Sequence, residues 1–393
     1  MNKKTRVLAG VKVLDLSRVL SGPWCTQTLG DLGADVVKVE RPPHGDDART
    51  YGHVLTAEAG EAAPLTSFYA ACNRNKRSIA LDLSTPEDAA LLRRLAAEAD
   101  VLVENFKAGT LARFELDYDS LKVVNPRLIY CSITGFGQTG PYAARPAYDF
   151  IMQGMSGLMS TCGEAGMPMR TAVPVTDLIA GSSATTAILA ALIQRAQTNE
   201  GQFIDCSMLD VAVTFNSHLA QTYLATRRMP ERIGNANPII APSELFETQD
   251  GWLIISVANE PQFKTFCALL EAPHWLTDER FASNWARVAH RTALHDAIES
   301  VIRTRPTRDW VALFADAGLP AGPINTLADV FDDPQVQHRE LLVEVDGADG
   351  SRLPLLRSSL NMSAVQIDYR RPPTMGEHTH EVLAQWLGEE VSR

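Results

Sequence analysis

The sequence predicts an α/β protein with a parallel sheet covered by helices on both faces, and three observations lead to this prediction. Short apolar runs alternate with helical stretches over roughly the first half of the 393 residues. These runs are nearly continuous in apolar residues, as in strands that are buried on both faces. After residue 225 the pattern changes to a hairpin followed by helices. A chain of this length exceeds one compact core, so two domains are expected.

The first part of the chain reads as successive strand–helix units. Expected strands are residues 11–17, 34–40, 78–83, 100–105 and 127–133, with helices at 24–33 and 85–99. Gly33 suits the end of the first helix. Thr85 can cap the second helix, Pro86 suits its first position, and Asp88 lies in its first turn.

Beyond these units we expect a helix at 178–197, a strand at 203–210 and a helix at 211–227. Residues 243–258 read as two strands around Asp250-Gly251, which is a strong hairpin signal. A helix is expected at 378–387. The predicted organisation is a large Rossmann-like domain over 1–224, a smaller inserted α+β domain over 225–330, and a return to the large domain over 331–393.

Composition narrows the classes of partner and compartment. The net charge of −11, from 36 basic and 47 acidic residues, makes nucleic acid an unexpected partner. None of the six cysteines lie at C-x-x-C spacing, so we expect reduced, mostly buried thiols in a cytoplasmic protein. The N-terminal apolar run is interrupted by Lys12 and Asp15, which argues against a signal peptide. The uncharged stretch 178–194 reads as too short and too weakly apolar to span a membrane.

The stretch "CSITGFGQTGPY" (131–142) contains the spacing G-x-G-x-x-G at Gly135, Gly137 and Gly140. A dinucleotide fingerprint must follow a strand, open a helix and precede a second strand that ends in an acidic residue. The strand is expected, but Pro141 and the sequence after it lack a helical period. We therefore interpret the stretch as a glycine-rich loop at the carboxyl end of a strand, where ligands often bind.

Several cations lie at or beside strand ends in this acidic chain. Arg74, Lys76 and Arg77 fall within four residues, Arg41 follows the strand 34–40, and Arg113 follows "VENFKAGTLA". Each one alone reads most simply as a solvated loop charge. Together they suit a ligand that carries phosphate groups.

Asp177 is the most informative carboxylate. It precedes a helix rich in small residues, and its simplest interpretation is that of a helix N-cap. A helix N-terminus also favours the ionised form, and an open, ionised carboxylate is what nucleophilic carboxylate catalysis requires. The H-x-H of His378 and His380 is expected at a surface helix start, and no metal site is expected.

These residues together resemble the family III CoA-transferases, a group that includes formyl-CoA transferase, carnitine CoA-transferase and the related alpha-methylacyl-CoA racemases. The matching stretches run in order from about residue 10 to 387. They are "VLDLSRVLSGPWCTQTLGDLGADVVKVERP", "NRNKRSIALDL", "VLVENFKAGTLAR", "ITGFGQTGPYAARPAYD", Asp177 with its helix, "GLPAGPINTLADVFDDPQV" and "RRPPTMGEHTHEVL".

The resemblance implies residue roles at the matching positions. Asp177 stands at the position of the catalytic aspartate, and the glycine loop of Gly135, Gly137 and Gly140 lies near the acyl site. The implied CoA contacts are Val19, Leu20, Arg41, Lys76, Leu81, Asn105, Phe106, Arg113 and Tyr148. The resemblance also implies an interlocked homodimer, with coenzyme A as the acyl carrier and no separate cofactor.

Two departures bear on the implied reaction. The formyl-CoA enzyme has a lysine near position 146, where this chain has Arg145 and Pro146, and its tetraglycine loop is missing. The segment "RIGNANP" resembles the corresponding segment of members that act on dicarboxylates. The sequence does not identify which acyl groups are transferred. The alternative activity in this group is racemisation, which needs a base on each face of the alpha carbon. Racemases have histidine where this chain has Tyr148, a poor base near neutral pH, so transfer of CoA to a free carboxylic acid is the preferred interpretation.

Overall fold

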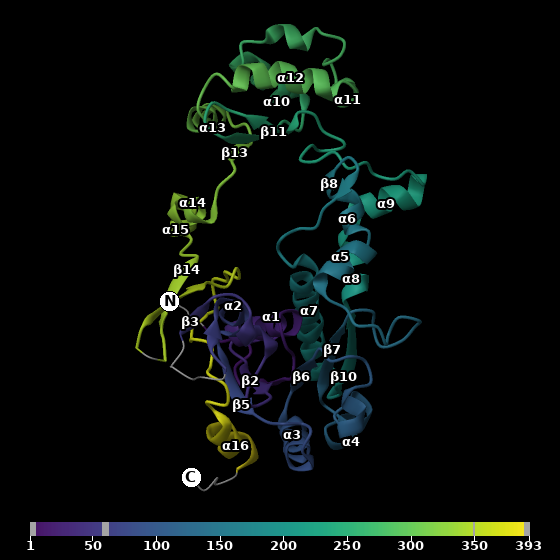
Figure 1. Cartoon of the computed structure of the whole chain (residues 1–393), viewed down its shortest axis with the longest axis vertical. Helices are drawn as coiled ribbons and strands as arrows, with labels where there is room; N and C mark the ends of the chain where they lie inside the picture. Colours follow the sequence, from purple (N-terminus) through teal and green to yellow (C-terminus); the bar gives the residue numbers. More distant parts are fainter. Residues whose placement is uncertain (1–4, 57–62, 349, 389–393) are drawn as a thin grey trace. The chain divides into compact units, whose positions relative to one another are not determined.

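The computed structural model describes residues 5–56, 63–348 and 350–388 (Figure 1). The chain divides into two compact units. The first contains the residues up to Leu158, Thr171–Ala220 and the residues from Gln337 onward. The second contains Met159–Arg170 and Gln221–Val336.

The first unit is built on a six-stranded parallel sheet. Its strands are β1 (Lys12–Asp15), β2 (Asp35–Glu40), β5 (Lys76–Ala80), β6 (Val101–Glu104), β7 (Ile129–Thr134) and β10 (Gln202–Ser207). They lie in the order β10-β7-β6-β1-β2-β5, and every neighbouring pair is parallel. The chain thus builds outward from β1 on one side and then from β6 on the other. In doubly wound sheets, ligands bind beside such a reversal, at the carboxyl ends of the strands.

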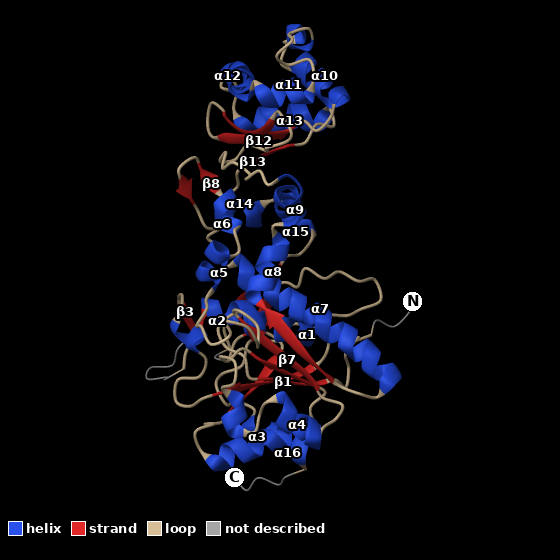
Figure 2. Ribbon diagram, turned by 90° about the vertical axis from the view of Figure 1, so that its right-hand side faces the viewer, coloured by secondary structure: helices blue, strands red, loops and turns tan. Residues whose placement is uncertain are grey.

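Helices cover both faces of this sheet (Figure 2). One face carries α1 (Ser21–Asp31) and α7 (Val175–Thr198), and the other carries α3 (Pro86–Glu98), α4 (Tyr118–Val124) and α16 (Thr379–Leu387). Successive strand residues point to opposite faces, so Val13 joins the core under α7 while Leu14 joins the core over α3. The continuous apolar strands therefore fill two cores, as the sequence predicts.

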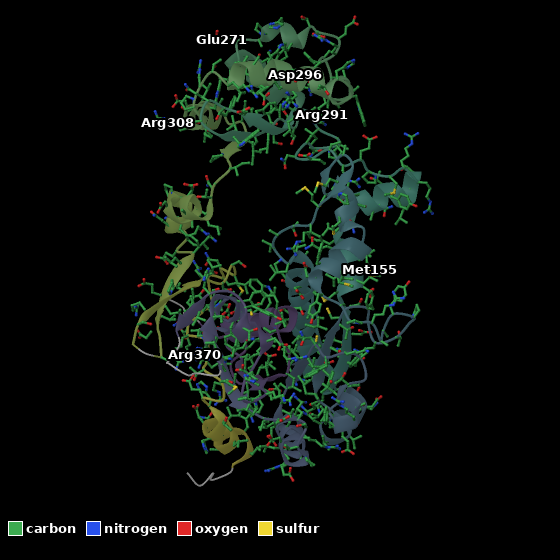
Figure 3. All side chains as sticks on the ribbon, viewed as in Figure 1. Met155, Glu271, Arg291, Asp296, Arg308 and Arg370 are labelled. Carbon is green, nitrogen blue, oxygen red and sulfur yellow. The ribbon has the colours of Figure 1, made fainter. Side chains whose placement is uncertain are left out.

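Shorter elements complete the first unit. They are β3 (Val54–Thr56), β4 (Leu65–Thr66), α2 (Ser67–Asn73), α5 (Asp149–Met155), α8 (Met208–Phe215), β14 (Leu342–Asp346) and β15 (Arg352–Leu356). Strands β8 (Gly163–Glu164) and β9 (Met167–Pro168) and most of helix α6 (Leu158–Thr161) belong to the second unit, and the residues of helix α9 (Ser217–Thr226) are divided between the two units. The C-terminal segment returns to the sheet: the backbone N–H of Arg370 (Figure 3) donates to Asn75 Oδ1 at 2.8 Å. Helix α16 then packs against α3 and β5.

The second unit combines a small antiparallel sheet with helices. Its elements are β11 (Ser243–Glu247), β12 (Trp252–Ser256), β13 (Ala321–Pro323), α10 (Glu260–Leu269), α11 (Asn284–Ala289), α12 (Arg291–Ile302), α13 (Thr307–Asp316), α14 (Leu327–Asp332) and α15 (Pro334–His338). The sheet order is β11-β12-β13. Its core packs Phe246, Phe266 and Phe314. Arg291 in α12 (Figure 3) pairs with Glu244 of β11 at 3.3 Å.

The α/β class is confirmed, and several element bounds differ from the sequence predictions. The strand expected at 78–83 begins at Lys76, and the helix expected at 211–227 is broken between α8 and α9. At that break Ser217 has a φ of 49°, and the side chain of Asn216 donates to the carbonyl oxygen of Ser156 at 3.0 Å. Neither a backbone irregularity nor a long-range bond leaves a periodic signal in the sequence.

Helix α7 is longer than expected. The stretch 178–194 read as too short to cross a membrane, but α7 spans 24 residues and is long and apolar enough to do so by length and composition alone. In the structure it lies against α1, β7 and β10, and Ala180, Ala184 and Ile188 are fully buried.

Candidate active site

Asp177 lies in the first turn of α7 and is not its cap. The helix begins at Val175, and the capping position is Pro174, which makes no side-chain cap. The N-cap interpretation of Asp177 is therefore wrong by three positions. Asp149, the first residue of α5, takes over this role: its Oδ1 accepts hydrogen bonds from the backbone N–H of Thr176 at 2.8 Å and from its hydroxyl at 2.6 Å. The side chain of Asp177 is left free for other partners.

The side chain of Gln153 holds Asp149 in place. Its Nε2 donates to Asp149 Oδ2 at 2.7 Å, and its Oε1 accepts the backbone N–H of Thr171 at 3.0 Å. Both oxygens of Asp149 are thus occupied as acceptors, and its charge acts on Asp177. A second negative charge therefore lies beside Asp177.

A close crossing of α1 and α7 brings Ser21 to Asp177. A Cβ at Gly181 would lie 2.4 Å from the carbonyl oxygen of Ser21, so only glycine fits where the helices touch. The space beside Gly181 is therefore filled by α1. The side chain of Ser21 acts on the Asp177 carboxyl group and lowers its pKa.

The environment of Asp177 favours its neutral form. Burial, followed by the negative charge of Asp149, raises the pKa of Asp177 from 3.8 to about 7, while the side chain of Ser21 works against this rise. The sequence predicts that the helix N-terminus favours the ionised form of Asp177. The net shift of its pKa is upward, so this prediction is wrong. Desolvation outweighs the field of the helix. Near neutral pH both forms of Asp177 are populated.

A cavity of about 210 Å³ opens in front of Asp177 at the carboxyl end of the sheet. It lies between the loops that follow β1, β6 and β7, which is where the strand order reverses. Its lining includes six of the residues that the sequence analysis placed at the site, together with Asp177. These six are Val19, Leu20, Asn105, Phe106, Gly135 and Tyr148.

A second cavity of about 180 Å³ collects three further residues that the resemblance places in contact with CoA. Arg41, Leu81 and Arg113 line it, together with the ring of Phe106. Arg41 forms an exposed ion pair with Asp82 at 3.4 Å. The lining is mostly apolar with cations at its edge, which suits an aromatic base that carries phosphates.

Arg18 and Phe106 line both cavities, so the two cavities are neighbours. The guanidinium of Arg18 lies 5.1 Å from the centre of the Phe106 ring. Asn105 bridges the two loops: its Oδ1 accepts the backbone N–H of Arg18 at 2.8 Å, and its Nδ2 donates to the Arg18 carbonyl at 2.7 Å. Asn105 and Phe106 could be predicted from the sequence, whereas Arg18, Ser21 and the capping role of Asp149 could not. The position of Arg18 after the first strand was the one available signal.

The basic cluster at 74–77 is structural. Lys76 Nζ is buried and donates to Asp15 Oδ2 at 3.0 Å, to Asn73 Oδ1 at 2.8 Å and to the carbonyl of Pro23 at 3.0 Å. All three ammonium protons are thus used, so Lys76 has no donor left for CoA. The predicted contact of Lys76 with CoA is therefore wrong. Arg74 and Arg77 likewise pair with Asp31 and Asp35, each at 2.5 Å.

The glycine loop is anchored to the neighbouring strand. The backbone N–H of Gly137 donates to Thr134 Oγ1 at 2.9 Å, and that of Gln138 donates to Asp205 at 3.0 Å. No helix begins until Asp149, which agrees with the rejection of a dinucleotide fingerprint. Of the three glycines, Gly135 is the one found in the described lining of the Asp177 cavity, and its missing side chain leaves room for Ala147.

The next candidates for functional groups are metal-binding side chains and cysteine thiols. Among the residues 5–56, 63–348 and 350–388, no group of three His, Cys, Asp or Glu side chains could hold a metal ion. All six cysteines are free thiols, and five are buried. Burial raises the pKa of both Cys25 and Cys72 to about 12, so these thiols are poorly reactive at neutral pH.

The carboxyl group of Asp177 thus lies beside a cavity at the strand-order reversal, where doubly wound folds bind their ligands. The chain belongs to CoA-transferase family III, whose family model matches residues 8–379. It is a CoA-transferase, and the racemase alternative is not favoured, because its close relatives are named as CoA-transferases.

Similar proteins match nearly the whole chain. Succinate–glutarate CoA-transferase of Agrobacterium fabrum is 47% identical over 96% of this chain and 95% of its own length. Human succinyl-CoA:glutarate CoA-transferase is 39% identical over 97% and 86%, respectively. A CaiB/BaiF family protein from Brucella suis has a crystal structure with a TM-score of 0.87, at 44% identity over 98% of this chain and 100% of its own.

Proposed function

We propose that this CoA-transferase moves CoA from an acyl-CoA thioester to a free dicarboxylic acid, with Asp177 as the residue that accepts the acyl group. The observation that carries the proposal is the pair of neighbouring cavities that share Arg18 and Phe106 in their linings. One cavity holds a desolvated carboxylate, and the other is an apolar pocket edged by arginines. CoA is a long ligand with a reactive thiol at one end and an adenine nucleotide at the other, and it matches this arrangement.

The proposed CoA contacts fall into two groups. Arg41, Leu81 and Arg113 hold the adenine nucleotide, since a planar guanidinium both stacks on aromatic rings and pairs with phosphate. The pantetheine arm runs past Phe106 toward Asp177, along the residues that line the first cavity. Those residues are Val19, Leu20, Asn105, Gly135 and Tyr148.

The proposed reaction exchanges one activated carboxyl group for another in four balanced steps. Asp177 attacks the donor thioester carbonyl, the C–S bond breaks, and an anhydride forms with release of CoA thiolate. The thiolate attacks the aspartyl carbonyl, which frees the donor acid and leaves an aspartyl-CoA thioester. The acceptor carboxylate then displaces the thiolate to form a new anhydride. Attack of the thiolate on the acceptor carbonyl gives the new acyl-CoA and restores Asp177.

The raised pKa of Asp177 fits the role of acyl acceptor. A carboxylate with a pKa of about 7 is a stronger base, and so a better nucleophile, than an ordinary aspartate once it is ionised. In this proposal the side chain of Ser21, which acts on this carboxyl group, donates to the aspartyl oxygen.

The proposed acyl groups are dicarboxylates of four or five carbons, which extends to this chain what the names of its relatives say of them. The sequence pattern "RIGNANP" is consistent with this choice. In the same proposal the enzyme acts as a homodimer in the cytoplasm. Residues 1–224 and 331–393 form the CoA-binding domain, and residues 225–330 form the small domain.

A transfer assay with mass-spectrometric detection tests the proposal. The enzyme is incubated with succinyl-CoA and a panel of free acids that contains glutarate and monocarboxylates of matching length. The expected result is glutaryl-CoA formed one-for-one with free succinate, and little product from the monocarboxylates. Release of free CoA without a new thioester would identify a hydrolase and contradict the proposal.

The same assay in heavy water examines racemisation. Position 148 carries a largely exposed tyrosine where racemases have histidine, so no deuterium is expected at the alpha carbon of 2-methylacyl-CoA beyond the uncatalysed level. Rapid enzyme-dependent exchange would move the activity to the isomerase branch.

A further inference from the structure

The turn after β1 contains a strained residue at the edge of the Asp177 cavity. Val19 has a φ of 67°, in the left-handed region that β-branched side chains rarely adopt. Such strain persists only where the surrounding structure holds it, and it is concentrated at functional sites. The question is therefore which groups hold Val19 in this conformation.

A buried ion pair holds the turn from both sides. Asp46 Oδ1 accepts the backbone N–H of Val19 at 2.9 Å and that of Ala48 at 2.9 Å. Asp46 Oδ2 lies 2.8 Å from Lys38 Nζ, an ionic contact that falls short of hydrogen-bond geometry and is its one partner among the described residues. Lys38 Nζ in turn donates to the carbonyl oxygen of Ser17 at 2.7 Å. Both charged side chains are fully buried.

The residue between the two held positions is Arg18. Lys38 fixes the carbonyl before it, Asp46 fixes the N–H after it, and Asn105 binds its own N–H and carbonyl. The backbone of Arg18 is thereby fixed on every side, although its side chain is exposed. This side chain lines both cavities of the proposed CoA site, and also a third cavity of about 440 Å³ formed by residues 39–47.

We infer that Asp46 and Lys38 are positioning residues for CoA: the pair keeps Val19 in the left-handed turn and so presents Arg18 and the backbone of this turn to the ligand. This inference rests on the proposed function. A buried ion pair is a poor way to gain stability, since apolar side chains of the same volume often do as well or better. This pair instead fixes the conformation of one turn, because Lys38 binds the carbonyl of Ser17 and Asp46 binds the backbone N–H of Val19.

Asp46→Asn tests the inference with little change of shape. In one orientation the new amide N–H₂ faces the ammonium of Lys38, and in the other it faces the N–H groups of Val19 and Ala48. Each orientation sets donor against donor, so the hold on the turn is lost. We expect the Kd for CoA and the KM for acyl-CoA to rise about tenfold. The kcat at saturating acyl-CoA should change much less, because Asp177 is untouched.

Asp31→Asn is the matched control. Asp31 is also buried and charged, and it accepts hydrogen bonds from Arg74 at 3.0 Å and from Asn75 at 2.7 Å. Asp31 lines neither of these two cavities in the described structure. This variant should lower the melting temperature while the KM for acyl-CoA stays within about twofold of wild type. A purely structural role of Asp46 would give the same pattern in both variants.

A rescue variant separates positioning from stability. Glycine adopts a positive φ without strain, so the turn in Val19→Gly no longer depends on the ion pair. The KM for acyl-CoA of Val19→Gly/Asp46→Asn should therefore lie within about twofold of that of Val19→Gly. This comparison also serves if Asp46→Asn alone fails to fold, because the double variant carries less strain.

The outcomes are distinct. The inference is supported if Asp46→Asn raises the KM for acyl-CoA about tenfold and if this rise is absent when Asp46→Asn is made in the Val19→Gly protein. An unchanged KM in a folded Asp46→Asn protein, or an equal loss with and without Val19→Gly, overturns it. Calorimetry of the wild-type protein with CoA is the first measurement: absence of binding there would remove the proposed function itself, whatever the variants do.

Discussion

Asp149 accepts a hydrogen bond from the backbone N–H of Thr176 at 2.8 Å, and this bond places a second carboxylate beside Asp177. The contact caps α7 and at the same time disfavours ionisation of Asp177. Burial is the larger cause of the raised pKa of about 7, and the charge of Asp149 adds to it. One residue of α5 thus links the start of the helix to the reactivity of the proposed nucleophile.

The first prediction concerns the pH dependence of transfer. Only ionised Asp177 can attack a thioester, so kcat/KM should rise with pH through about 7 and then level off. Asp149→Asn removes the neighbouring charge, which lowers the pKa of Asp177 and moves the rising limb to lower pH. The measurement is kcat/KM for succinyl-CoA from pH 5 to 9 in both proteins. If the rise of kcat/KM occurs at the same pH in wild type and Asp149→Asn, Asp149 does not act on Asp177 through its charge.

The second prediction concerns stability. The pKa of Asp177 is higher in the folded protein than its ordinary 3.8, so the folded state holds the proton more tightly. The free energy of unfolding due to this group is fully present below pH about 4 and is lost as pH rises through about 7. Asparagine cannot ionise, so Asp177→Asn should melt at a higher temperature than wild type at pH 8.

The same comparison at low pH is the control. Near pH 4 both proteins carry an uncharged side chain at this position, so their melting temperatures should converge. A difference between Asp177→Asn and wild type that is constant from pH 4 to pH 8 would contradict the assigned direction of the pKa shift.

The third prediction concerns the crossing of α1 and α7. A methyl group at Gly181 would meet the Ser21 carbonyl at 2.4 Å, so Gly181→Ala must push the helices apart. We expect a loss of about 1–3 kcal/mol in the free energy of unfolding. Transfer should also slow, because Ser21 moves away from Asp177. Ser183→Ala, two residues along and on another side of the helix, is the control and should change both properties little. Normal transfer in folded Gly181→Ala would exclude a role for this contact.

The fourth prediction concerns the nucleotide end of CoA. Arg41→Ala and Arg113→Ala should each weaken CoA binding about tenfold at low salt, because each removes a cation from the second cavity. The loss should shrink as salt rises, since these side chains are exposed and their charges are screened. Calorimetry at two salt concentrations measures this. Arg127→Ala, an exposed arginine before the amino end of β7, should bind CoA as wild type does.

The architecture could be predicted where local signals agree with the final packing. The strands β1, β2, β6 and β7 fill two cores and so appear as continuous apolar runs. The capping of α3 by Thr85 and the hairpin of β11 and β12 were also predicted, and both are confirmed. In each case the residues that decide the structure are neighbours in the chain.

The site could be predicted only in part. Resemblance supplied residues that the structure brings together, such as Asn105 and Phe106. It could not reveal that Lys76 forms a buried ion pair with Asp15, because the two lie 61 residues apart in sequence and meet only in the folded sheet. The strained turn at Val19 was invisible for the same reason, since Asp46 and Lys38 hold it from other elements. The pKa of Asp177 depends on burial, which local sequence does not encode.

The most direct test of the central claim is to trap the acyl group on Asp177. The enzyme is given succinyl-CoA without an acceptor, then hydroxylamine, and the peptide that contains residue 177 is analysed by mass spectrometry. The account predicts that Asp177 becomes a hydroxamate, because hydroxylamine cleaves either the anhydride or the aspartyl-CoA thioester at this carbonyl. It also predicts that Asp177→Ala folds, binds CoA, acquires no label and loses transfer. A hydroxamate on another residue, or substantial transfer by folded Asp177→Ala, would contradict the account.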